Sequence, residues 1–198
     1  MDMGTNRADD LDYLFSVDYI DGQFHCQLKD EALENVFAKN AIKEQEVVPR
    51  FVTENQTRVK TPKDVPLSIF RSQMWEEYNS RCIACGRCNY VCPTCTCYTM
   101  QDVFYTDNGK VGERRRVGAS CMVDGYTNVA GGGEYRKNHG DRMRFKTMHK
   151  IYDFNKRFGY NMCVGCGRCD TVCPEYISFS NIINKVTAEV EKEAANEN

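Results

Sequence analysis

Apolar and polar residues alternate over residues 13–28 in a pattern that predicts a β-hairpin. Both halves of this segment contain β-formers, and Asp21-Gly22 between them is a two-residue turn signal. Residues 30–41 then place Leu, Val and Phe at helical spacing, which predicts a helix. A hairpin and one helix bury too little apolar surface to fold alone. We therefore interpret residues 1–43 as the hairpin–helix remnant of an N-terminal domain.

The pattern changes over residues 44–66, which contain three prolines and many polar residues, so a linker is expected there. Apolar residues at helical spacing return from residue 67 and lead up to Cys82. This stripe predicts one helix, with Asp64 as its cap.

The second half of the chain shows three more elements. A hairpin is predicted to turn at 107–109, and a helix is predicted to start at Asp141 and end near Gly159. A last helix is expected to be capped by Ser180. The polar residues 188–198 predict a frayed tail.

A duplicated cysteine run is the strongest signal in the sequence. Residues 82–93 and 163–174 are identical at eight of twelve positions, and both read C-x2-C-x2-C-x3-C-P. Bacterial proteins bind [4Fe–4S] clusters with this run, and the cysteine before proline ligates the other cluster of the pair. We therefore assign the ligands of two [4Fe–4S] clusters as follows: Cys82, Cys85, Cys88 and Cys173 for the first cluster, and Cys163, Cys166, Cys169 and Cys92 for the second.

The two runs predict an α+β fold with a two-cluster bacterial ferredoxin-like domain over residues 67–187. Residues 93–162 form a long insertion between the runs, which small ferredoxins lack. Structural zinc is an alternative, but it commonly uses two C-x2-C pairs with a longer gap. A disulfide framework suits small secreted chains, and no signal peptide is evident here. Iron–sulfur clusters are therefore the favoured interpretation.

Composition narrows the class of protein further. The formal charge is −2, and eight thiolates with two cluster cores would bring it to about −6, which argues against nucleic acid as a partner. No stretch approaches eighteen apolar residues, so no membrane insertion is expected. Free thiolates and clusters need a reducing compartment, and the cytoplasm is the expected location.

Four cysteines remain outside the two ligand sets. Most unpaired cysteines are small buried residues, and Cys26 is interpreted in this way. Cys95, Cys97 and Cys121 could instead build a further metal site with an outside ligand, or the first two could line the first cluster. Their role stays open at this point.

Two sets of arginines could affect function. Arg87 and Arg168 occupy matching places in the two runs, where a positive charge would raise a cluster's reduction potential. The alternative is that both guanidinium groups point to water. The run 114–116 is Arg-Arg-Arg, which is typical of a solvated face and could also dock an anionic partner.

With these residues in view, the stretch from Cys82 to Asn184 closely resembles the iron–sulfur electron-transfer subunit of the three-subunit anaerobic sulfite reductase. The insertion carries this resemblance as much as the cysteine runs do. The matching segments are Cys-Pro-Thr-Cys-Thr-Cys (92–97), Met-Gln-Asp-Val-Phe-Tyr (100–105), Gly-Glu-Arg-Arg-Arg (112–116), Met-Arg-Phe-Lys (143–146) and Cys-Pro-Glu-Tyr-Ile (173–177). The β subunit of sulfhydrogenases is a related protein that shares the Cys-Pro-Thr-Cys start.

The resemblance implies an electron carrier with two [4Fe–4S] clusters, and the ligands of that family match ours position by position. It also implies two partners, one that binds flavin and nicotinamide and one whose sirohaem reduces sulfite to sulfide. Family members have a sizeable domain ahead of a Met-Gly-Thr-Asn-like segment, which here starts at Met3, so the N-terminal domain is expected to be lacking.

Three classes of function therefore remain. The first is the electron-transfer subunit of a complex, either sulfite reductase or a sulfhydrogenase-type hydrogenase. The second is a free-standing two-cluster ferredoxin, and the third is a zinc-binding interaction module. The sequence contains no flavin, nicotinamide or sirohaem motif, so no catalytic residue is assigned and the chain is not expected to be catalytic on its own.

Overall fold

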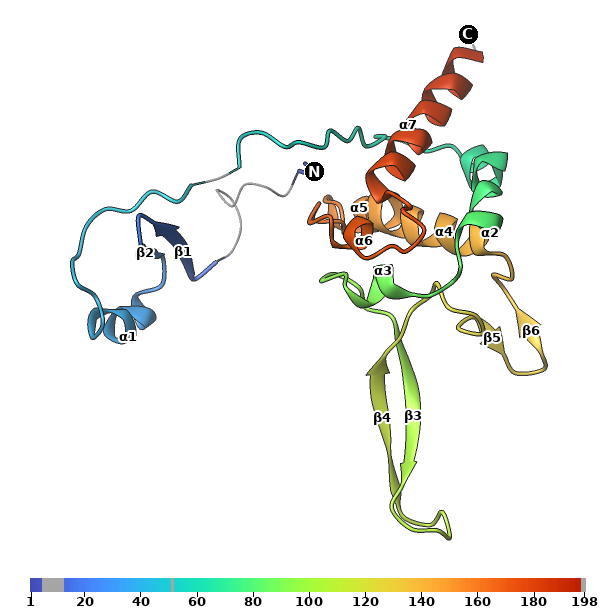
Figure 1. The fold of residues 1–198 in the computed structure, drawn as a ribbon, viewed down its shortest axis with the longest axis horizontal. Coiled ribbons are helices and arrows are strands. Elements are labelled where there is room, and N and C mark those ends of the chain that lie inside the picture. Colours follow the sequence, from blue (N-terminus) through green and yellow to red (C-terminus); the bar gives the residue numbers. More distant parts are fainter. Residues whose placement is uncertain (5–12, 51, 197–198) are drawn as a thin grey trace. The chain divides into compact units, whose positions relative to one another are not determined.

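The computed structural model describes residues 1–4, 13–50 and 52–196, which belong to two compact units. The smaller unit spans residues 4–55, and the larger unit comprises residues 1–3 and the chain from residue 56 onward. Both contain short helices and two-stranded antiparallel sheets (Figure 1). No helix in the described part of the chain is long and apolar enough to cross a membrane.

The smaller unit confirms the predicted hairpin. Strands β1 (Phe15–Ile20) and β2 (Gln23–Leu28) pair with Ile20 opposite Gln23. Asp21 and Gly22 both have positive φ, as the two central residues of a type I′ turn require.

The predicted helix over residues 30–41 is shorter than expected. It consists of the 3₁₀ turn η1 (Glu31–Leu33) and helix α1 (Glu34–Ala38). Phe37 packs against Phe15 with 5.3 Å between ring centroids, whereas Val36 is 60% exposed. The predicted apolar face is therefore wrong at Val36, because five residues make too short a helix to bury a full stripe.

The larger unit contains the remaining elements. Before the insertion lie η2 (Leu67–Arg71), η3 (Gln73–Trp75), α2 (Glu77–Arg81) and α3 (Arg87–Tyr90). The insertion contributes β3 (Tyr98–Phe104), β4 (Gly112–Gly118), β5 (Asn128–Val129), β6 (Gly133–Glu134), α4 (His139–Met148), the π-helical segment η4 (His149–Asp153) and α5 (Phe154–Phe158). Helices α6 (Arg168–Thr171) and α7 (Phe179–Asn196) complete the unit.

The single helix predicted from residue 67 to Cys82 is wrong. Ser72 has an extended backbone and its hydroxyl accepts a hydrogen bond from the amide of Met74, so the helical path is broken there. The indole of Trp75 donates to the carbonyl of Ile69 at 2.7 Å, which fixes the bend. Asp64 caps none of these pieces, because η2 follows directly on the extended Pro66.

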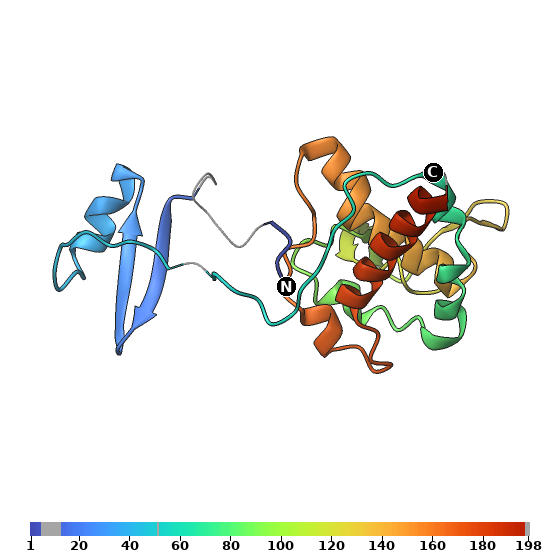
Figure 2. The ribbon, with the colours of Figure 1, turned by 90° about the horizontal axis from the view of Figure 1, so that it is seen from above.

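The expected linker 44–66 is shared by the two units: residues 44–55 belong to the smaller unit and residues 56–66 to the larger one. Residues 56–66 run beside α7 (Figure 2), where the amide of Lys60 donates to the side-chain carbonyl of Asn184 at 2.9 Å. Thr187 on α7 donates in turn to the carbonyl of Lys60. At the other end of the chain, α7 continues to Asn196, through the segment expected to be frayed.

The insertion carries a long ribbon and a long helix. The pair β3–β4 projects away from the helices as an almost entirely exposed two-stranded ribbon (Figure 1). Helix α4 begins at His139, two residues before the predicted start, so Asp141 lies in its first turn and pairs with Arg144 at 3.2 Å. Through η4 and α5 the helical path ends at Gly159 in the left-handed conformation, as predicted.

Two caps differ from the predicted ones. The first turn of α4 is closed by Asn79 of α2, whose side-chain oxygen accepts from the amide of Gly140 at 2.8 Å. Before α7, the carboxylate of Asp170 accepts from the amide of Phe179 at 2.8 Å. Ser180 itself is buried inside the helix and is not its cap.

The core of the larger unit lies between α4, α7 and the segment before the first cysteine run. It includes Met143, Met148 and Ile151 from the insertion, packed with residues of α7 and with Ile69, Trp75 and Tyr78. The insertion is therefore a structural part of the cysteine-bearing unit.

Candidate metal centre

The two cysteine runs adopt the same local conformation. Gly86 has φ 73° and ψ −7°, and its counterpart Gly167 has φ 73° and ψ −5°. Each glycine is followed by one helical turn, α3 or α6. A side chain is disfavoured at positive φ, so glycine at this point lets the loop curl back over its own cysteines. The sequence duplication is thus also a duplication of structure.

The first set of predicted ligands surrounds one cavity. Its walls include all four thiols assigned to the first cluster: Cys82, Cys85, Cys88 and Cys173. Cys169 of the second set also reaches this cavity. Burial raises the pKa of the Cys82 thiol, and the thiols of Cys88, Cys85 and Cys173 raise it further because like charges would repel. The cysteine before the second proline therefore lies with the first run.

The second set shows the mirrored arrangement. Burial raises the pKa of Cys163, and the nearby thiols of Cys92 and Cys166 add to this effect. Cys169 interacts with Cys163 in the same way. Cys92, the cysteine before the first proline, is thus placed beside the second run.

The thiols are spread out and do not converge on one point. Within the described residues, no three Cys, His, Asp or Glu side chains are arranged to hold a single metal ion. A [4Fe–4S] cluster distributes four thiolates over four irons, so its ligands do not converge as the ligands of a lone ion do. The spread therefore fits a cluster better than a mononuclear zinc site.

Two buried lysines provide an independent test of whether these residues fit anionic clusters. Lys146 and Lys150 lie one turn apart, on α4 and η4, and each is only 5% exposed. Among the residues that the structure describes, no carboxylate forms an ion pair with either ammonium group. A buried charge without a counter-charge costs several kcal/mol. Clusters with four thiolates each would supply that counter-charge.

The contacts of the lysines agree with this role. Lys146 approaches Cys88, Cys169 and Cys92, and these thiols raise its pKa although burial alone would lower it. The ammonium of Lys150 lies 3.3 Å from the hydroxyl of Thr94. Burial alone would raise the pKa of Cys92, but the Thr94 hydroxyl and the Lys150 charge together lower it. Lys146 thus lies close to thiols of both ligand sets, and Lys150 lies close to the second set.

Of the two interpretations given for Arg87 and Arg168, the structure agrees with the one in which both guanidinium groups meet water. Both side chains are exposed, so their charges are screened by water.

The sequence analysis did not identify Lys146 and Lys150 as site residues, although the sequence pattern could have pointed to them. These lysines recur four residues apart on the helix face that also carries Met143, whereas the lysines of a solvated face would lie among polar neighbours.

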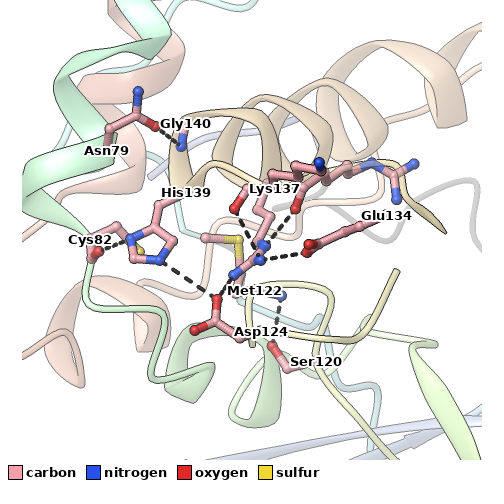
Figure 3. Close-up of polar contacts among 11 residues, drawn as sticks. Asn79, Cys82, Ser120, Met122, Asp124, Glu134, Lys137, His139 and Gly140 are labelled. Atoms are coloured by element: carbon pink, nitrogen blue, oxygen red, sulfur yellow. Dashed lines mark hydrogen bonds and ion pairs between the residues drawn. The ribbon is translucent and has the colours of Figure 1, made fainter. Parts of the chain in front are cut away.

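A polar network supports the first run from the insertion (Figure 3). The imidazole of His139 contacts the carbonyl of Cys82 and lies 3.7 Å from Asp124. Arg142 is 2% exposed and binds Asp124, Glu134 and two backbone carbonyls. Because every nitrogen of this buried guanidinium donates a hydrogen bond, it anchors the loops after β4 to α4, and thereby also the residue that contacts Cys82.

The four remaining cysteines are not equivalent. Cys26 is half-buried in β2 of the smaller unit. Cys95, Cys97 and Cys121 lie together at the base of the β3–β4 ribbon, where Cys97 contacts both other thiols. The side-chain amide of Asn89 donates to the sulfur of Cys121 at 3.0 Å.

The arginine run of β4 is exposed, and each arginine has a partner within the ribbon. Arg114 lies 3.2 Å from Asp102, and Arg115 pairs with Glu113. Arg116 stacks over the ring of Tyr98 at 4.0 Å. In the isolated chain, these three side chains therefore form a solvated face, as the first interpretation of the arginine run stated.

The internal repeat allows a controlled test of the loop geometry. Gly86→Ala and Gly167→Ala introduce the same strain of about 1–2 kcal/mol at positive φ. A Cβ at Gly86 would also lie 2.7 Å from the Val123 side chain, whereas at Gly167 it would meet no atom within 4 Å. Chemical denaturation should therefore show a larger loss of stability for Gly86→Ala, by about 1–3 kcal/mol. Equal losses would show that the contact with Val123 is not restrictive.

Comparisons with known proteins are consistent with this site. Residues 81–177 match the model of a family described as a 4Fe-4S dicluster domain. Sulfhydrogenase 2 subunit beta of Pyrococcus furiosus is 38% identical to the chain over 117 residues, which are 59% of this chain and 34% of the relative. The chain thus spans about a third of the length of this curated relative. No solved structure matches it significantly.

The matches support a ferredoxin-like domain that binds 4Fe–4S clusters, and an iron–sulfur protein of electron transfer. The matched range begins one residue before the first cysteine of the first run and ends four residues after the last cysteine of the second. It therefore contains all eight predicted ligands and the whole insertion. The name of the relative contains the word subunit, so that protein is part of a larger complex. This is consistent with a chain that works with partners.

Proposed function

We propose that the chain is the electron-transfer subunit of an anaerobic sulfite reductase complex and carries electrons through two [4Fe–4S] clusters. The electron-transfer role rests on the pairing of two cysteine sets with two buried lysines that have no carboxylate partner among the described residues, and the choice of sulfite reductase rests on the resemblance of the insertion. Cys82, Cys85, Cys88 and Cys173 would hold one cluster, and Cys163, Cys166, Cys169 and Cys92 the other. When bound, each cluster accepts and releases one electron at a time.

The chain's own residues suit this task. The cysteines provide all ligands, so no open metal position is left for a substrate. The lysines stabilise added negative charge in a setting that excludes water. We place the reduction of sulfite on a sirohaem partner, because six electrons are needed and two clusters hold only two. A second partner with flavin and nicotinamide would supply the electrons.

A sulfhydrogenase-type complex is the second candidate, favoured by the 38% identity to a sulfhydrogenase β subunit. The cysteine sets and lysines serve either complex equally well. In both cases the exposed β3–β4 ribbon is the proposed docking element, because an isolated two-stranded ribbon gains stability by packing against another surface. Cytoplasmic location is part of the proposal, since reduced thiolates persist in that compartment.

The proposal predicts three results for the purified chain. Anaerobically prepared protein should be brown and contain about eight iron atoms per chain, from four per cluster. Dithionite should bleach its visible absorption, but sulfite should yield no sulfide. Sulfide should be produced once the sirohaem partner and an artificial electron donor are added. A colourless zinc protein, or sulfide formation by the chain alone, would contradict the proposal.

Partner identity separates the two candidate complexes. Affinity purification of the chain from its native cell should recover a sirohaem protein under the sulfite reductase hypothesis. Recovery of a hydrogenase subunit without sirohaem would instead establish the second candidate. Recovery of neither, with both clusters intact, would indicate a free-standing ferredoxin.

A further inference from the structure

Three thiols that the proposed clusters leave unused converge at the base of the β3–β4 ribbon. Cys95 and Cys97 precede β3, and Cys121 follows β4. The strand pairing continues one step beyond the ribbon, because the amide of Ala119 donates to the carbonyl of Cys97 at 3.1 Å. This extension brings residues that are 24 positions apart to the same place. The ribbon therefore fixes the position of Cys97 relative to Cys121.

The sulfur of Cys97 lies among groups that can donate hydrogen bonds. These groups are the thiol and the backbone amide of Cys121, the thiol of Cys95 and the hydroxyl of Tyr126. The hydrogen bond from Cys121 is the strongest of these influences, and together they lower the pKa of Cys97 to about 5 despite its burial. A half-buried thiolate at neutral pH is a nucleophile towards sulfur.

Cys121 is the complementary partner. It is 3% exposed, and its proximity to Cys97 together with its burial raises its pKa, so it keeps its proton. Its sulfur also accepts the hydrogen bond from Asn89, the residue that follows the proposed ligand Cys88 in α3. A thiol and a thiolate thus face each other beside the first cluster site.

The three thiols are not arranged around a single metal ion. In the part of the chain that the structure describes, no group of three such side chains is placed to hold one ion, and this group is included. Both cluster ligand sets are already complete without these cysteines. The contact between Cys97 and Cys121 is instead the contact that precedes a disulfide.

We propose that Cys97 and Cys121 form a redox-active pair that cycles between a dithiol and a disulfide in exchange with the proposed clusters. The inference rests on the proposed function for its electrons. Reduction breaks the sulfur–sulfur bond with two electrons, drawn one from each [4Fe–4S] cluster, and one proton from solvent restores the Cys121 thiol while Cys97 is released as the thiolate. Oxidation runs in reverse, with the two electrons returned one at a time. The pair would let a one-electron carrier store or deliver two electrons together.

The first experiment maps the disulfide. The anaerobic, cluster-loaded chain is treated with oxidised glutathione, unfolded in an alkylating agent and digested for mass spectrometry. Two of the twelve cysteines should resist alkylation, and one cross-linked peptide pair should join Cys97 to Cys121. Full alkylation, or a cross-link between other cysteines, would overturn the proposal.

Matched variants test the assignment of the pair. Cys97→Ser and Cys121→Ser should each abolish the cross-link, whereas Cys26→Ser in the smaller unit should leave it unchanged. Cys95→Ser should also keep it, because Cys95 only donates a hydrogen bond to Cys97. If Cys121→Ser instead removes bound metal while eight irons remain, the three thiols hold a metal and the proposal is wrong.

The second experiment tests the electron source. The oxidised chain is reduced with dithionite, freed of excess reagent and followed by absorption. Cluster absorption should recover as two thiols per chain appear, and Cys97→Ser should lack this recovery. A brown, reducible chain that never regains its thiols would count against this inference alone. A colourless chain would remove the proposed function and this inference with it.

Discussion

Replacing Cys92 by serine is expected to remove the cluster of the second run and to leave the cluster of the first run in place. The expectation follows from the placement of Cys92 beside Cys163, with Lys150 close to both thiols. Iron content should fall from about eight to about four atoms per chain, since each cluster contains four irons. Electron paramagnetic resonance of the reduced variant should match that of Cys163→Ser.

The control for this prediction comes from the first run. Cys85→Ser removes a ligand of the other set, so its spectrum should resemble that of Cys173→Ser and differ from that of Cys92→Ser. If Cys92→Ser and Cys85→Ser give the same spectrum, each run binds its own cluster. The grouping of Cys173 with the cavity of the first run would then be a coincidence of packing.

Replacing Lys146 by methionine is expected to make the reduction potential of the proposed first cluster markedly more negative, because Lys146 lines the cavity of the first ligand set. For unit charges roughly 6 Å apart, an effective dielectric constant near 20 gives an interaction of about 3 kcal/mol. For a one-electron couple this corresponds to about 130 mV. Methionine keeps the length and apolar stem of lysine, so the measured change reports the lost charge. A redox titration followed by electron paramagnetic resonance measures it.

Arg87→Met is the matched control for Lys146→Met. It also removes one positive charge near the first run, but this side chain is exposed. Solvent screening should limit its effect to about 20 mV. Equal shifts for the two variants would show that burial of Lys146 does not strengthen its influence, and no shift in Lys146→Met would remove the lysines from the electrostatic argument.

The sequence predicted the cysteine runs well because their information is local. Spacing and the two matching glycines determine the loop, and the structure gives Gly86 and Gly167 the same backbone angles. The hairpin at Asp21-Gly22 was predicted for the same reason, since two residues with positive φ determine its turn. Such features depend on neighbours in the sequence and not on distant packing.

The elements that were mispredicted depend on side-chain hydrogen bonds that apolar spacing does not encode. The helix expected from residue 67 breaks at Ser72, where the indole of Trp75 turns back to Ile69. The cap of α4 comes from Asn79 on another helix, about sixty residues earlier. The first contact is local and depends on polar groups, and the second is formed only when α2 packs against α4.

The same distinction applies to the site. Spacing was enough to propose the cysteine ligands, but it did not point to the charges beside them. Arg87 and Arg168 are adjacent in sequence to the cysteines and are exposed, whereas Lys146 and Lys150 come from the insertion and are buried. Only the fold shows that the helix after the ribbon brings lysines close to both sets of ligands.

The position of α4 also affects how quickly the protein can assemble. Contacts between α4, α7 and the segment before Cys82 join residues far apart in sequence, and folding slows as such separations grow. In the metal-free chain the lysines on α4 and η4 must be buried without the clusters that would balance their charge, so that chain meets an electrostatic barrier in folding. Iron–sulfur loading during folding would remove that barrier, and refolding in its absence should be slow and incomplete.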